Sequence, residues 1–132
     1  MSKPLSLDDC LELMRRGIED VAICTDGVDR ERFLLDRTRQ LALVKALENI
    51  GETAGDVLAT YPDFATGERD IPWRAWKNAR NRLCHGYHSI DYDLVWSMAQ
   101  RDVPALNNAL QAIADFDHLR QIQGLGGPGR SV

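Results

Sequence analysis

Apolar residues recur every three or four positions along most of the chain, which is the spacing of an amphipathic helix. Residues 6–24 show this pattern first. Ser6 stands where a helix cap is expected, and Asp9 follows three residues later, as the second residue of a capping box does. Thr25-Asp26-Gly27 then supplies a glycine end signal. We therefore predict a first helix over residues 6–24.

A broader apolar stripe predicts a second, long helix from Asp29 to Leu58. Gly51 interrupts this stripe, and a glycine inside a helix costs about 1 kcal/mol relative to alanine. Its presence indicates either the close approach of a neighbouring helix or a kink. The segment from Tyr61 to Asp70 is rich in turn-forming residues and is predicted to be a loop.

A third helix is predicted from Pro72, with Asp70 ahead of it as the cap, to about Tyr87. A fourth helical region begins near Tyr92. The segment 102–104 indicates a new helix start, because proline favours the first turn of a helix, and the stripe then continues to about residue 119.

These elements predict an all-α protein, an up-and-down bundle of four to five helices that forms a single domain over residues 1–120. No alternating strand pattern of useful length occurs. The Gly-rich segment 121–132 is expected to be a flexible tail. Exposed apolar surface on so small a bundle favours a homodimer.

Charge is distributed unevenly along the chain, which has a net charge of -4. The window from Ile71 to Ile90 contains four of the 16 basic residues, two of the three histidines and none of the 20 acidic residues. A local basic patch of this kind attracts phosphates, while the acidic remainder limits indiscriminate binding.

Several classes of protein are not favoured by the sequence. No run of 18 apolar residues occurs and no apolar leader begins the chain, so we expect a cytoplasmic protein without a membrane partner. The three cysteines lack paired spacing, which favours reduced thiols. His85 and His88 have a spacing that suits a metal, but no acid or cysteine pair lies nearby, so no metal or other cofactor is expected.

The chemistry-bearing residues of the basic window are Arg80 and His85. Cleavage of RNA by its own 2′-hydroxyl needs a base, positive charge on the phosphorane and a proton donor. Histidine titrates near neutral pH and serves as base or acid, and the guanidinium fork of arginine matches phosphate geometry. On an ideal helix the two side chains lie about 140° apart, so two copies meeting across a dimer make a better site than one copy.

Each of these residues also has a purely structural interpretation. His85 is then a hydrogen-bonded residue near a helix end, Arg80 the partner of an acid, and Tyr87 a packing residue. The tryptophans Trp73, Trp76 and Trp96 favour core or dimer contacts over base stacking. A solvated basic face that also helps to hold RNA is expected from Arg74, Lys77 and Arg82.

The run Arg80-Asn-Arg-Leu-Cys-His-Gly-Tyr87 resembles the Arg-x4-His-x-Tyr motif of HEPN-domain toxins of the HepT type. The resemblance extends over nearly the whole chain to about residue 119. Its other elements are the Ile-Pro-Trp run at residues 71–73, the Ile-Gly-Glu run at 50–52, and the segments 90–91, 95–96 and 102–104.

This resemblance implies an all-α homodimer that acts as a metal-independent endoribonuclease toxin and leaves 2′,3′-cyclic phosphate ends. The two motifs are expected to converge at the dimer interface, with Arg80 and His85 catalytic. Asn81, Arg82 and Lys77 are expected to support RNA binding. The implied partner is an MNT-type nucleotidyltransferase antitoxin, as in type VII toxin–antitoxin pairs. It can transfer AMP to the motif tyrosine, here Tyr87.

Two other functions remain open on sequence alone. The bundle is in one case a non-catalytic scaffold or substrate subunit that binds a nucleotidyltransferase. In the other it is a helical interaction protein whose basic segment is structural. RNA cleavage by the partner-free protein separates the first hypothesis from both of these.

Overall fold

The computed structural model describes residues 4–83 and 89–122 and, for Arg80, the backbone alone. Within these ranges every helix or strand assigned is a helix, which confirms the predicted all-α class. The elements are α1 (Leu7–Thr25), α2 (Arg30–Phe33), α3 (Arg37–Thr60), α4 (Pro62–Gly67), α5 (Trp73–Lys77), α6 (Ala79–Leu83), α7 (Tyr92–Ser97), the π-helical turn η1 (Met98–Asp102) and α8 (Val103–Ile122).

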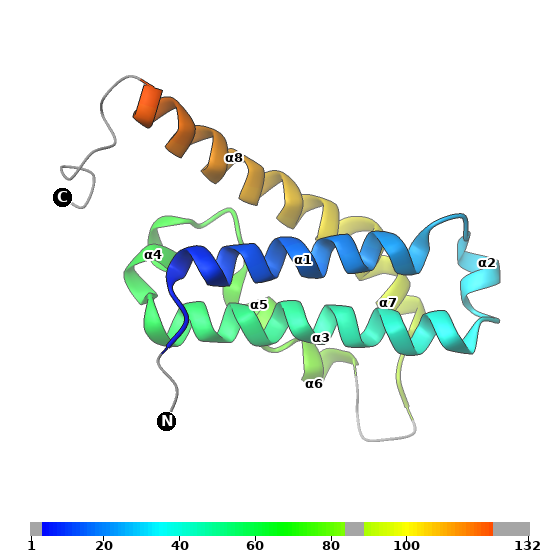
Figure 1. Ribbon diagram of the computed structural model, residues 1–132. Coiled ribbons are helices and arrows are strands. Elements are labelled where there is room, and N and C mark those ends of the chain that lie inside the picture. The colour runs from blue at the N-terminus through cyan, green and yellow to red at the C-terminus, as the bar shows by residue number, and fades with distance from the viewer. Residues whose placement is uncertain (1–3, 84–88, 123–132) are drawn as a thin grey trace.

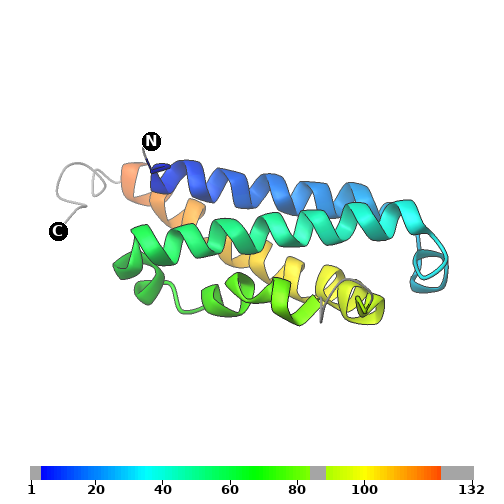
Figure 2. The same cartoon turned by 90° about the horizontal axis from the view of Figure 1, so that it is seen from below.

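Two long antiparallel helices, α1 and α3, form the frame of the bundle (Figure 1). They pack closely because Gly17 of α1 has no side chain; a Cβ there would lie 2.6 Å from Cγ1 of Ile50. On one side of this pair lie the short helices α5 and α6, and α8 crosses diagonally from α7 toward the start of α1 (Figure 2). The second half of α8 diverges from the pair (Figure 1).

The first helix agrees with its prediction. The Oγ of Ser6 accepts a hydrogen bond from the amide of Asp9 at 3.0 Å, which satisfies one of the free N–H groups of the first turn. Gly27 follows the helix with φ of +69°, the left-handed region that favours glycine.

The single helix predicted over Asp29–Leu58 is wrong, because the chain breaks between α2 and α3. The carboxylate of Asp29 caps α2 by accepting from the amide of Arg32 at 2.9 Å. Asp36 begins a second helix in the same way, accepting from the amide of Arg39 at 3.1 Å. Two capping carboxylates seven residues apart thus define two helices, although the apolar stripe runs through both.

The loop predicted over residues 61–70 is also wrong in part, since α4 occupies its first half. Pro62 stands in the first turn of that helix, where its missing N–H has no cost. The next helix begins at Trp73 and not at Pro72, and no side chain caps it, so the predicted cap by Asp70 is not present.

The single third helix predicted to reach Tyr87 is interrupted at Asn78, which separates α5 from α6. The carbonyl of Asn78 accepts from the amides of Asn81 and Arg82, at 3.0 and 3.3 Å, and so begins a new helix. The end of the predicted helix, from residue 84 onward, lies outside the described residues.

The restart predicted at residues 102–104 is a π-helical turn instead of a break. Pro104 has no N–H to donate to the preceding turn, and the chain accommodates this in η1 without ending the helix. The last helix then continues to Ile122, somewhat beyond the predicted end. The remainder of the predicted tail lies outside the described residues.

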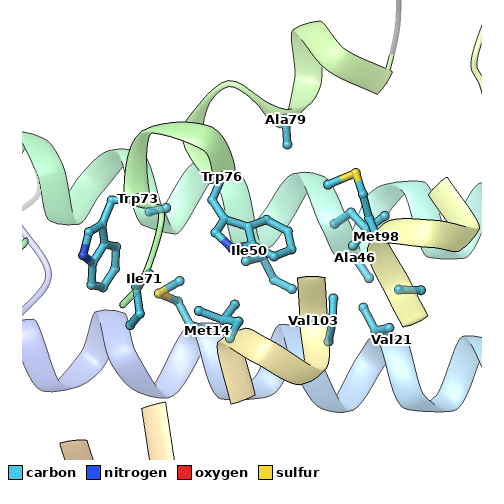
Figure 3. Packing of buried hydrophobic residues seen from close by; sticks show 14 of the residues in the cluster. Met14, Val21, Ala46, Ile50, Ile71, Trp73, Trp76, Ala79, Met98 and Val103 are labelled. Carbon is cyan, nitrogen blue, oxygen red and sulfur yellow. The ribbon is translucent and has the colours of Figure 1, made fainter. Parts of the chain in front are cut away.

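One contact between helices places α5 on the frame. At Gly51 of α3, a Cβ would lie 2.3 Å from the carbonyl oxygen of Trp76, closer than real Cβ atoms approach oxygen. Of the two interpretations that the sequence allowed for this glycine, a close approach or a kink, the close approach is confirmed. The side chain of Trp76 is 3% exposed and, like Met98, belongs to the hydrophobic core shown in Figure 3.

We expect Gly51→Ala to destabilise the protein, because the added methyl group meets backbone that cannot move without shifting α5. Overpacking of this kind costs about 1–3 kcal/mol, which exceeds the helix propensity that alanine gains. The free energy of unfolding from urea denaturation, followed by circular dichroism, measures the effect.

Gly55→Ala is the matched control in the same helix. There a Cβ would meet only the flexible side chain of Lys77, at an ordinary 3.4 Å from Cγ. Alanine at this position is expected to be neutral or stabilising by up to about 1 kcal/mol. Equal unfolding free energies for the two variants would show that the Gly51 contact does not constrain the fold.

Candidate functional site

The candidate site residues lie on and directly after α6, beside the end of α5. Lys77 is the last residue of α5, and Arg80, Asn81 and Arg82 belong to α6. The side chains of Lys77, Asn81 and Arg82 are exposed. His85, proposed as catalytic, and the proposed modification site Tyr87 lie outside the described residues, together with Cys84, Gly86 and His88.

The helix α5 is held by its two tryptophans. Trp73 and Trp76 are 4% and 3% exposed, so both belong to the core, as predicted. The indole Nε1 of Trp73 donates to the carbonyl of Glu68 at 3.1 Å, and its ring meets the Phe64 ring edge-on at 5.9 Å. Because α5 is anchored in this way, the start of α6 has a defined position on the frame.

The helix α6 is anchored by one apolar face. Ala79 and Leu83, four residues apart, are both buried to 1% exposure or less. Figure 3 shows Ala79 pointing from α6 toward the core. Residues four apart lie on the same face of a helix, so the face that carries Asn81 and Arg82 is turned to solvent.

The chain that follows the motif is held at the end of the frame where α2 precedes α3. A carboxylate oxygen of Asp91 accepts from the amide of Leu94 at 3.1 Å and begins α7. Tyr92 accepts a hydrogen bond from Arg37 at 2.8 Å through its hydroxyl, and Arg30 pairs with Asp93. Both neighbours of the motif, α6 and α7, are thus fixed to α3.

The trio of exposed cations Arg74, Lys77 and Arg82 has no neutralising partner among the described residues. The ion pairs recorded there use Arg15, Arg30 and Arg39, none of which lies on α5 or α6. A guanidinium or ammonium group without a partner acid remains available to phosphate. This agrees with the positive window predicted from the sequence.

A small cavity lies between α5–α6 on one side and η1–α8 on the other, with a volume of about 120 Å³. Arg82 lines it, together with Asp102 of η1 and Asp70 from the connection before α5. Sequence reasoning missed Asp102 as a site residue, because the Asp-Val-Pro run was interpreted as a helix start. A signal was present, since a carboxylate stands four residues from both Met98 and Leu106 on an apolar face.

Other reactive groups do not form a second centre in the parts of the chain that are described. Cys10 and Cys24 are free thiols, and burial raises the pKa of each, so both stay protonated at neutral pH. Within residues 4–83 and 89–122, no group of three or more potential metal ligands occurs. Across the same residues, no helix is long and apolar enough to cross a membrane.

Comparison with known proteins relates most of the chain to one family. The family described as ribonuclease HepT-like matches residues 14–113. A probable ribonuclease HepT of Thermococcus cleftensis is 31% identical over 105 residues, which are 80% of this chain and 93% of that protein. A putative RNase of Methanocaldococcus jannaschii is 31% identical over 118 residues, covering 89% of this chain and 88% of that protein. No solved structure gives a significant match.

Proposed function

Because this chain belongs to the ribonuclease HepT-like family, we propose that it is a metal-independent endoribonuclease whose catalytic residues are Arg80 and His85. The observation that carries the proposal is the position of the motif. Its arginine lies on a helix with an exposed basic face, on a chain that is otherwise acidic.

The proposed reaction is an internal transesterification of RNA. His85 accepts the proton of a 2′-hydroxyl, and the 2′-oxygen attacks the adjacent phosphorus. The bond from phosphorus to the 5′-oxygen breaks, and that oxygen takes up a proton as it leaves. The products are a 2′,3′-cyclic phosphate and a 5′-hydroxyl. The guanidinium of Arg80 stabilises the extra negative charge of the phosphorane.

The neighbouring cations hold the RNA. Lys77 and Arg82 are exposed, have no partner acid among the described residues and lie within two or three positions of Arg80. Both contact backbone phosphates in this proposal, and Asn81 donates its amide hydrogens to the same strand. Contacts of this type give affinity that falls as salt rises, with little dependence on sequence.

The working unit is proposed to be a homodimer in which each site combines both motifs. Support comes from large apolar side chains exposed on the monomer, notably Leu35 at 89%, Ile122 at 66% and Phe116 at 58%. Exposed apolar area of this kind is commonly covered by a second copy.

The toxin is proposed to be neutralised by an MNT-type nucleotidyltransferase in the cytoplasm. In that reaction the hydroxyl oxygen of Tyr87 attacks the α-phosphorus of ATP, pyrophosphate leaves, and the hydroxyl proton passes to a base of the nucleotidyltransferase. The added AMP places bulk and negative charge two residues from His85, where it competes with RNA phosphate.

Partner-free protein is expected to cleave RNA in the presence of EDTA and to leave cyclic phosphate ends. His85→Ala should lower kcat by about 10²–10⁴-fold, the usual contribution of a general base. Arg80→Ala should lower it by about 10²-fold or more. Gel-resolved cleavage of a labelled RNA, with thermal unfolding of each variant alongside, provides the measurement.

His118→Ala and Arg101→Ala are the matched controls, since both residues are exposed and lie outside the motif. They should cleave as the wild type does. If the wild type cleaves nothing, the scaffold alternative holds. If His85→Ala is as fast as the wild type, the catalytic assignment is wrong.

Mixing two inactive variants tests the composite site. Arg80→Ala and His85→Ala, exchanged by mild denaturation and refolding, form mixed dimers with one complete Arg–His pair across the interface. The mixture should regain about a quarter of wild-type activity, because half the dimers are mixed and each holds one good site. If each protomer carries its own complete site, the mixture stays inactive.

Incubation with the nucleotidyltransferase and ATP should add AMP to the protein and abolish cleavage. Tyr87→Phe removes the acceptor hydroxyl, so that variant should gain no mass and keep cutting RNA under the same conditions. Tyr92→Phe, which changes a tyrosine on α7, is the control and should be modified normally. Intact-protein mass spectrometry reads the outcome, and AMP found on the Tyr87→Phe variant would contradict the assignment.

A further inference from the structure

The cavity beside α6 has an apolar floor and a polar rim. Its floor includes Trp76, Met98 and Leu106, which are between 1% and 3% exposed. Its rim includes Asp70, Arg82 and Asp102, all of which are exposed. Ligand sites combine these features, with apolar walls that bind a flat body and a few polar groups that orient it. The volume of about 120 Å³ leaves room for one small ring system and not for a larger molecule.

The cavity adjoins the proposed catalytic segment. Arg82, on its rim, follows Arg80 by two residues in the same helix, which is a rise of about 3 Å along the helix axis and a rotation of about 200° around it. An RNA strand bound at Arg80 reaches the mouth of the cavity if it continues around this short helix. A base next to the cleaved bond is in reach of the floor if it is unpaired.

The two charged groups from opposite walls remain available to a ligand. Arg82 and Asp102 line the same cavity, yet neither side chain forms a hydrogen bond or an ion pair in the described part of the chain. Asp102 also ends the π-helical turn, an irregularity that often marks functional positions.

The register of Asp102 strengthens this interpretation. Met98, Asp102 and Leu106 recur every fourth residue and all line the cavity, and the outer two are 1% exposed. An apolar residue at the middle position would extend the core across the cavity. A carboxylate there keeps the cavity open and gives it a hydrogen-bond acceptor.

The polar rim selects one class of ligand. Two carboxylates disfavour a free anion, so inorganic phosphate is a poor occupant. A carboxylate accepts hydrogen bonds from the exocyclic amino group of a base, as aspartate does from cytosine. Uracil presents carbonyl oxygens at the corresponding edge and is repelled.

We propose that this cavity is a base-recognition subsite, which takes one unpaired nucleobase with an exocyclic amino group next to the cleaved bond. Asp102 accepts from that amino group, the floor packs against the ring, and Arg82 binds the flanking phosphate. The inference rests on the proposed ribonuclease function and adds a sequence preference to it.

Cleavage of an RNA pool with randomised single-stranded loops, read by sequencing of the ends, tests the preference. The wild type should disfavour uracil at one position beside the cleaved bond. Asp102→Asn, whose amide both donates and accepts, should reduce this discrimination about 10-fold. Asp115→Asn makes the same change on an exposed part of α8 outside the cavity and should leave the preference unchanged. An unaltered preference in Asp102→Asn would overturn the subsite.

Nucleotide binding provides a readout independent of cleavage. Cytidine monophosphate should shift the Trp76 indole signal in ¹H–¹⁵N spectra of the wild-type protein, and uridine monophosphate and inorganic phosphate should not. The shift should be lost in Asp102→Asn. A cytidine-specific shift without RNA cleavage would reject the ribonuclease function and keep the nucleobase site. Cleavage with no shift at Trp76 would reject the subsite. An Asp102→Asn variant whose only defect is weaker binding to a protein partner would also reject it.

Discussion

The backbone of α3 meets the carbonyl oxygen of Trp76 at Gly51 so closely that no side chain fits between them. This contact lets α5 lie on the frame, and the buried rings of Trp73 and Trp76 then hold it there. Since α6 follows after a single residue, Asn78, the position of the motif arginine depends on that contact. A stability constraint in α3 thus sets the geometry of a site on another helix.

Beside this contact, the buried residues and the charged residues of α6 lie on different faces of the helix. One face of α6 is buried through Ala79 and Leu83, while Asn81 and Arg82 remain on the solvent side. The exposed cations there have no partner acid in the described residues, although the chain as a whole is acidic. Positive charge left unpaired on a rigid support suits phosphate binding better than a flexible basic tail, because less side-chain and backbone entropy is lost when the ligand binds.

The family relationship indicates which chemistry this geometry serves. The chain is assigned to the HepT-like ribonucleases by its sequence. The fold explains why the motif, residues 80–87, can be so short. Core packing holds α6 against α3, while Arg37 of α3 and Arg30 of α2 hold α7. The cavity lined by Asp102 adds a contact surface that no linear motif contains, since its walls come from segments about 20 residues apart.

The sequence by itself determined the helical class, the first helix with its Ser6 cap and the motif, because each depends on local spacing. At Gly51 the sequence left a close approach and a kink open, and the tertiary structure decided for the close approach. Only the tertiary structure decided where the long predicted helices break. The apolar stripe runs through both α2 and α3, and the break at Asn78 lies where α5 meets α3. The π-helical turn and the cavity beside it likewise depend on contacts between distant segments. The energies of such contacts cannot be read from a local sequence pattern.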